Sequence, residues 1–127
     1  MSSTTFARVV TGVAAAVFLL PGVWAFAAPR SFYEIVATFP PFNLHLFHDL
    51  GAFQLGVGAA LLVALFTSDA LLAGLAGGAA GTVVHAISHW LDQNLGGRPS
   101  DPWVLSALAL VVVAALVVRL RAVRARA

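Results

Sequence analysis

Four long apolar stretches, separated by short polar segments, dominate the pattern of this chain. Each is long enough, at about 1.5 Å per residue, to cross the roughly 30 Å hydrocarbon layer of a bilayer as a helix. Polar residues gather in the connections and at the two ends. The pattern therefore predicts an all-α fold in one integral membrane domain, residues 1–127, with four transmembrane helices at about 9–28, 44–66, 70–91 and 103–120.

The first stretch admits a second interpretation. Ala25-Phe26-Ala27 fits the small-x-small pattern of a signal-peptide cleavage site. The apolar run is nevertheless longer than the roughly 7–15 residues of a usual signal-peptide core, so we favour a retained helix. Cleavage would leave three spans in the same orientation.

The connection between the first two stretches contains an amphipathic segment. Its apolar residues recur at helical spacing, which predicts a short helix lying at the membrane interface: Phe32, Ile35, Val36 and Phe39. Pro40-Pro41 ends this segment, and Asn43 is predicted to cap the next helix.

The second and third stretches are joined only by Thr67-Ser68-Asp69. Such a short connection predicts an antiparallel hairpin of adjacent helices. Small residues let helix backbones approach closely in lipid. A stripe of four glycines on the third stretch is therefore predicted to be a packing face: Gly74, Gly77, Gly78 and Gly81.

Composition and charge agree with a membrane protein. Of all residues, 61% are hydrophobic and 9% charged, against roughly 25% charged in soluble domains. The lack of Cys excludes disulfides and thiolate metal sites, and no basic patch with interleaved aromatics points to nucleic acid. Arginines near both ends predict a multi-pass protein of the cytoplasmic membrane with both termini in the cytoplasm: Arg8, Arg119, Arg121, Arg124 and Arg126.

All four histidines lie in the predicted hairpin, two near its start and two near its end. His45 and His48 are three residues apart, and His85 and His89 are four apart, so each pair shares a helix face. Antiparallel pairing predicts that the four imidazoles meet at the outward-facing end, with His48 close to His85.

Several interpretations of this histidine cluster stand side by side. We prefer a structural polar cluster where helix ends meet water. The functional alternatives are a metal site of His45, His48, His85 and His89, a haem held by His48 and His85, or a proton relay. No catalytic motif is present, so no catalytic residue is predicted.

Three short motifs, in order, resemble the DoxX-like family of small four-helix membrane proteins. They are Pro29-Arg30-Ser31-Phe32-Tyr33 after the first helix, His48-Asp49-Leu50-Gly51 running into Gly56-Val57-Gly58, and Leu91-Asp92 leading to Gly97-Arg98-Pro99-Ser100. Relatives often carry an arginine where His48-Asp49 stands here. The resemblance implies a four-helix integral membrane protein, and some such relatives are subunits of membrane redox assemblies.

These observations lead to one functional expectation and one alternative. We expect a non-catalytic accessory or interaction subunit whose partners are the lipid bilayer and another membrane protein or a second copy of the chain. The alternative is a redox subunit that binds haem or a metal ion through the histidines. Nucleic acid is not an expected partner.

Overall fold

The computed structural model describes residues 2–67 and 70–125. Its helices are α1 (Ser3–Ala27), α2 (Pro29–Ile35), α3 (Leu44–Phe66), α4 (Leu71–Leu91) and α5 (Asp101–Arg124). The described residues contain no strand, so the predicted all-α fold with a short helix between the first two spans is confirmed. Ser68 and Asp69 of the predicted turn lie outside the described residues.

Two helices are longer than the apolar pattern predicted, because polar residues at their ends continue them. The α1 helix begins at Ser3, where the Ser2 hydroxyl oxygen accepts a hydrogen bond from the Thr5 amide at 3.1 Å. The α5 helix runs on to Arg124, with Arg121 and Arg124 in its last turn. The positive charges of these arginines interact favourably with the partial negative charge at the C-terminal end of the helix.

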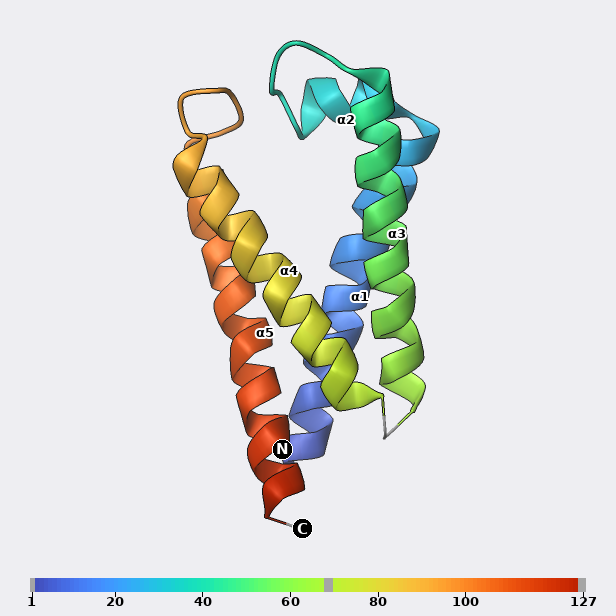
Figure 1. Ribbon diagram of the computed structural model, residues 1–127, viewed down its shortest axis with the longest axis vertical. Helices are drawn as coiled ribbons and strands as arrows, with labels where there is room; N and C mark the ends of the chain where they lie inside the picture. The colour runs from blue at the N-terminus through green and yellow to red at the C-terminus, as the bar shows by residue number, and fades with distance from the viewer. Residues whose placement is uncertain (1, 68–69, 126–127) are drawn as a thin grey trace.

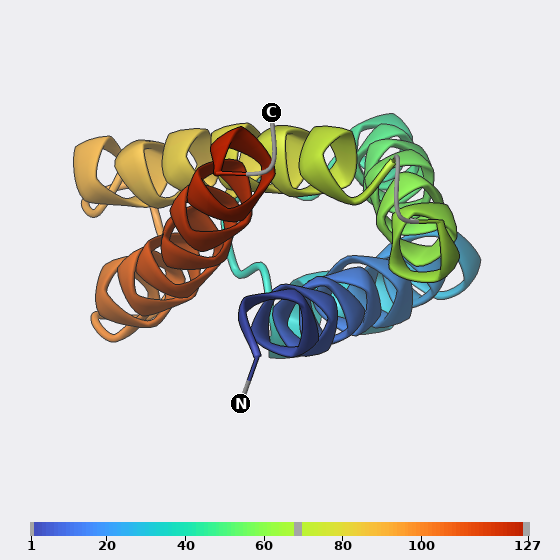
Figure 2. The ribbon, with the colours of Figure 1, turned by 90° about the horizontal axis from the view of Figure 1, so that it is seen from below.

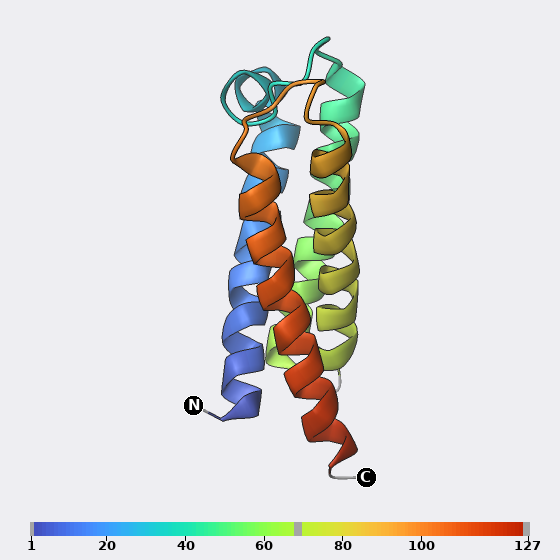
Figure 3. The ribbon, with the colours of Figure 1, turned by 90° about the vertical axis from the view of Figure 1, so that its left-hand side faces the viewer.

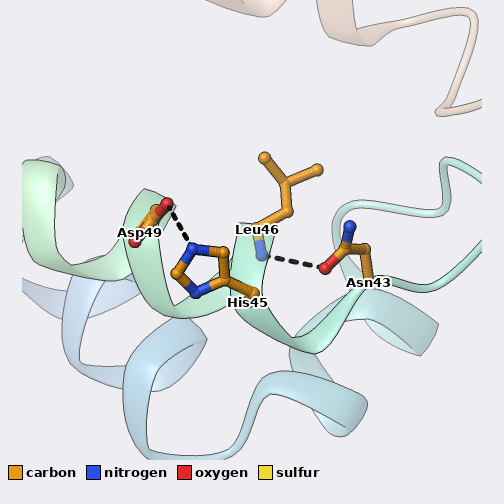
Figure 4. A network of polar contacts seen from close by, with 4 residues as sticks. All are labelled: Asn43, His45, Leu46 and Asp49. Atoms are coloured by element: carbon orange, nitrogen blue, oxygen red, sulfur yellow. Dashed lines mark hydrogen bonds and ion pairs between the residues drawn. The ribbon is translucent and has the colours of Figure 1, made fainter.

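The predicted cap of the second span is confirmed. The Asn43 side-chain oxygen accepts a hydrogen bond from the Leu46 amide at 3.2 Å (Figure 4). This bond satisfies one of the amides that have no partner within the first turn of a helix. The α3 helix consequently has the bounds predicted from the sequence, residues 44–66.

The four long helices run between two distinct ends of the molecule. Both termini lie at one end, which we call the terminal end (Figure 1). The opposite end, called the loop end, carries α2 and the segments 36–43 and 92–100. Viewed from the side, α2 lies across the loop end rather than along the bundle (Figure 3).

The long helices pack as two pairs. The α1 helix packs most extensively against α3, and α4 against α5. The α3 and α4 helices lie close together at the terminal end, where the chain connects them, and diverge toward the loop end (Figures 1 and 2). The two helices of the predicted hairpin, α3 and α4, are thus adjacent only near their connection. Over most of its length each packs against a different helix, α3 against α1 and α4 against α5.

The α1–α3 pair is held by backbone-to-backbone approach. An added Cβ at Gly51 would lie 2.8 Å from both the Gly22 carbonyl oxygen and the Phe26 amide nitrogen. At Gly58 an added Cβ would lie 2.6 Å from Leu19 Cγ. No side chain fits at these points, so glycine allows the two helices to touch.

The glycine stripe of α4 is a packing face only in part. Gly78 is buried, and an added Cβ would lie 3.2 Å from Leu61 Cδ2. At Gly81 the nearest atom, Phe18 Cζ, is 3.9 Å away, and at Gly77 nothing lies within 4 Å. The prediction that the whole stripe packs inside the bundle is therefore wrong for Gly77 and Gly81, which are both exposed.

Side chains inside the bundle are small, and many large apolar ones face outward. Alanines make up half of the main buried cluster: Ala7, Val10, Ala14, Ala15, Leu61, Leu71, Leu75, Ala79, Val112 and Ala115. Phe53, Phe66 and Leu91 are each more than three quarters exposed, at 77%, 76% and 77%. All four long helices are long and apolar enough to cross a membrane. This arrangement suits a bundle surrounded by lipid.

Replacing Gly51 with alanine should destabilise the protein by about 1–3 kcal/mol, the usual range for overpacking. The added methyl group would meet backbone atoms of α1, which cannot rotate away. Unfolding of the purified protein by SDS, followed by circular dichroism, measures the change. Gly56→Ala is the matched control on the same helix, since nothing lies within 4 Å of its added Cβ. Equal stability of the two variants would show that the α1–α3 contact is not tight.

Candidate functional site

At the loop end, a cluster of aromatic rings packs around α2. Phe32 is buried at 3% exposure, with its ring 5.5 Å from that of Trp24 and 6.1 Å from that of Phe47. Tyr33 and Phe42 complete the cluster around Phe47. The predicted amphipathic segment is only partly helical, since α2 ends at Ile35 and leaves Val36 and Phe39 beyond it. Phe32 enters the aromatic cluster, and Phe32, Val36 and Phe39 all border a cavity described below.

The two segments of the loop end are tied to each other. The Arg98 guanidinium donates from Nη2 to the Ile35 carbonyl oxygen at 2.7 Å, and the Gly97 amide donates to the Thr38 carbonyl oxygen at 3.2 Å. Asp101 Oδ2 accepts a hydrogen bond from the Arg98 amide at 2.8 Å. Gly96 and Gly97 have positive φ angles, 147° and 77°, which side chains rarely adopt. The connection to α5 therefore closes against the segment after α2.

A cavity of about 360 Å³ borders these segments. Its walls come from α2, α3, α4 and α5 and from the segments next to α2 and α5. A second cavity of about 180 Å³ lies deeper, toward Val17, Phe18 and Leu108. Both are lined by the same five residues, so they adjoin: Phe32, Val36, Gln54, His85 and Leu105.

The structure brings together the two histidines of α4 but does not join them to those of α3. The rings of His85 and His89 are 4.9 Å apart, and the His89 ring is also 5.5 Å from that of Phe39. Both side chains border the cavity. His48 instead packs its ring 5.1 Å from that of Phe26, on the side of α1. The divergence of α3 and α4 accounts for this separation.

His45 lies at the surface of the loop end. Its Nε2 is 3.5 Å from Asp49 Oδ2, one helical turn along α3 (Figure 4). The two side chains are 86% and 54% exposed. Such an exposed pair contributes little to stability. It fits the structural interpretation of this histidine, a polar group where a helix end meets water.

The described residues contain no group of three or more His, Cys, Asp or Glu side chains arranged to hold a metal ion. The geometry thus adds no support to a metal site of His45, His48, His85 and His89, or to a haem between His48 and His85. Both stay predictions from the sequence.

Sequence reasoning missed Gln54, a polar residue in the middle of the second span. Its Oε1 is buried and has no hydrogen-bond partner among the described residues. It borders both cavities together with His85. The signal was present in the sequence, because an amide side chain inside an apolar span is costly unless it has a partner or a function.

Comparisons with protein-family models, with curated proteins and with solved structures found no match. The resemblance to DoxX-like proteins therefore stays a prediction. The class that the fold defines is that of a multi-pass helical membrane protein with a cavity at one end of its bundle.

Replacing Arg98 with leucine should loosen the loop end. The variant loses the hydrogen bond from Arg98 Nη2 to the Ile35 carbonyl oxygen, a solvent-exposed bond that contributes about 0.5–1.5 kcal/mol. Amide hydrogen exchange of residues 35–39 should then speed up by roughly two- to tenfold. Arg124→Leu, at the terminal end, is the control and should leave this segment unchanged. Unchanged exchange in the Arg98 variant would contradict the closure described here.

Proposed function

We propose that this protein is a non-catalytic accessory subunit of the cytoplasmic membrane, which binds a transmembrane helix of a partner along the groove between α3 and α4. One observation supports this most directly. The groove has a volume of about 570 Å³ and is lined by residues no larger than leucine: Val57, Ala59, Ala60, Leu61, Val63, Ala70, Ala73, Gly74, Gly77 and Gly78.

The lining of this groove matches what helix association in lipid requires. Lipid offers no hydrophobic drive between helices, so they associate through close packing at small residues. At Gly77 an added Cβ would meet nothing within 4 Å, so the α4 backbone is accessible there. A groove with accessible backbone on a lipid-facing surface fits another helix better than it fits a polar ligand. The partner is another membrane protein or a second copy of this chain.

The proposed orientation places both termini in the cytoplasm. Both termini lie at the same end of the bundle (Figure 1). Arginines concentrate there, with Arg121 and Arg124 in the last turn of α5. Positive charge is retained on the cytoplasmic side during insertion. The loop end with its cavity then faces outward.

Reporter fusions test this orientation. A reporter that is active only outside the cytoplasm should give no signal when fused after residue 127. The same reporter should be active when inserted after Asn94, in the segment at the loop end. The reverse pattern would place the loop end in the cytoplasm and overturn the proposal.

A substitution that fills the groove tests partner binding. Gly77→Leu should abolish or strongly reduce association without unfolding the protein, since the new side chain meets no atom within 4 Å at its Cβ. Native gel electrophoresis after mild detergent extraction, together with co-purification of two differently tagged copies, measures hetero- and homo-association. Gly56→Leu is the matched control, because Gly56 is equally open but does not line the groove. A complex that survives Gly77→Leu, or wild-type protein that migrates only as a monomer, would contradict the proposal.

A further inference from the structure

We propose that the cavity at the loop end binds a neutral, lipid-soluble phenol, a molecule that joins an apolar body to a ring hydroxyl group. The proposal rests on the cavity and its polar groups and is independent of the α3–α4 groove. The larger of the two adjoining cavities, at about 360 Å³, is of the size found for small-molecule sites, and the deeper one extends it by about 180 Å³.

Gln54 supplies the first argument. Gln54 borders both cavities, and its Oε1 is buried and has no partner among the described residues. An unpaired acceptor in an apolar environment is costly, and a hydrogen-bond donor from a ligand would satisfy it. The ligand therefore carries an O–H or N–H group at this depth.

His85 supplies the complementary group. His85 belongs to α4, whereas Gln54 belongs to α3, and both residues border both cavities. A neutral imidazole carries one N–H donor and one acceptor nitrogen. A hydroxyl group donates one hydrogen bond and accepts others, so its chemistry matches an acceptor on Gln54 and a donor on His85. Thr82, the other polar residue of the deeper cavity, already donates to the Gly78 carbonyl oxygen at 2.8 Å.

The charges around the cavity favour a neutral ligand. Arg98 and Asp101 are the charged residues of its lining, one of each sign. Arg98 is engaged through the Ile35 carbonyl oxygen and Asp101 through the Arg98 amide. Their opposite charges favour neither an anionic nor a cationic head group, and the deeper cavity is lined by no Asp, Glu, Lys or Arg among the described residues.

The remaining walls favour a ring. Phe32 and Phe39 border the larger cavity, and Phe18 and Phe32 border the deeper one. Aromatic side chains pack edge-to-face and offset against other rings, with more favourable energy than against aliphatic chains of equal area. A hydroxyl group on an aromatic ring, a phenol, combines both requirements. His89 and Arg98 also line a more polar cavity of about 400 Å³ formed by the segment before α5.

Photoaffinity labelling of the full-length protein in liposomes tests the proposal. The probe is a 4-alkylphenol with a diazirine in its alkyl chain, and mass spectrometry locates the labelled residues. Labelling is expected within residues 32–39, 50–54 and 104–108. Excess 4-hexylphenol should prevent it, whereas the methyl ether 4-hexylanisole, which cannot donate a hydrogen bond, should compete at least tenfold less well.

Two variants and one control assign the hydroxyl contacts. Gln54→Leu and His85→Phe should each raise the concentration of 4-hexylphenol needed for half-competition at least tenfold. Gln54→Leu should unfold no more easily than the wild type, because the lost carbonyl had no partner among the described residues. Gln93→Leu, a glutamine outside this cavity that donates to the Trp90 carbonyl oxygen, should bind like the wild type.

Three results would overturn the proposal. One is labelling spread over the lipid-facing surface that no competitor reduces. Another is equal competition by the phenol and its methyl ether. The third is unchanged competition in both folded variants. If Gln54→Leu does not fold, the His85→Phe variant and the methyl ether still decide the question.

Discussion

The contact between α1 and α3 at Gly22 and Gly51 is the constraint on which the rest of the bundle depends. There the helices meet through backbone atoms, and a single added carbon would lie 2.8 Å from the Gly22 carbonyl oxygen. In lipid, where apolar surface gains little by being buried against other apolar surface, such close approach is the main source of helix affinity. It binds α3 to α1 along the length of the bundle, rather than to its neighbour in the chain.

The site at the loop end follows from this pairing. Since α3 is held by α1 and α4 by α5, the two helices of the hairpin separate once their connection no longer keeps them together. The cavity between them is bordered by α2 and the two loop-end segments, and Gln54 and His85 line it. A bundle in which α3 and α4 stayed adjacent would close this cavity and bring the histidines together.

The same pairing leaves a groove on the outside of the bundle. Near their connection α3 and α4 lie close, and their facing residues are so small that a furrow remains between them. The protein thus has two surfaces of opposite character. One is an open apolar groove suited to another helix, and the other is a partly enclosed cavity with polar groups suited to a small molecule.

The sequence alone determined the number of long helices and the bounds of α3, because apolar runs and caps act locally. The bounds of α3 and the Asn43 cap were predicted residue for residue. The tertiary structure alone decided which helices pair and therefore which polar residues meet. A short connection restrains only the ends it joins, whereas partner choice depends on glycines such as Gly51 and Gly22, far apart in the chain, that must face each other. For this reason the His48 ring packs against Phe26 of α1, and Gln54, unremarked in the sequence, lines the cavity with His85 and His89.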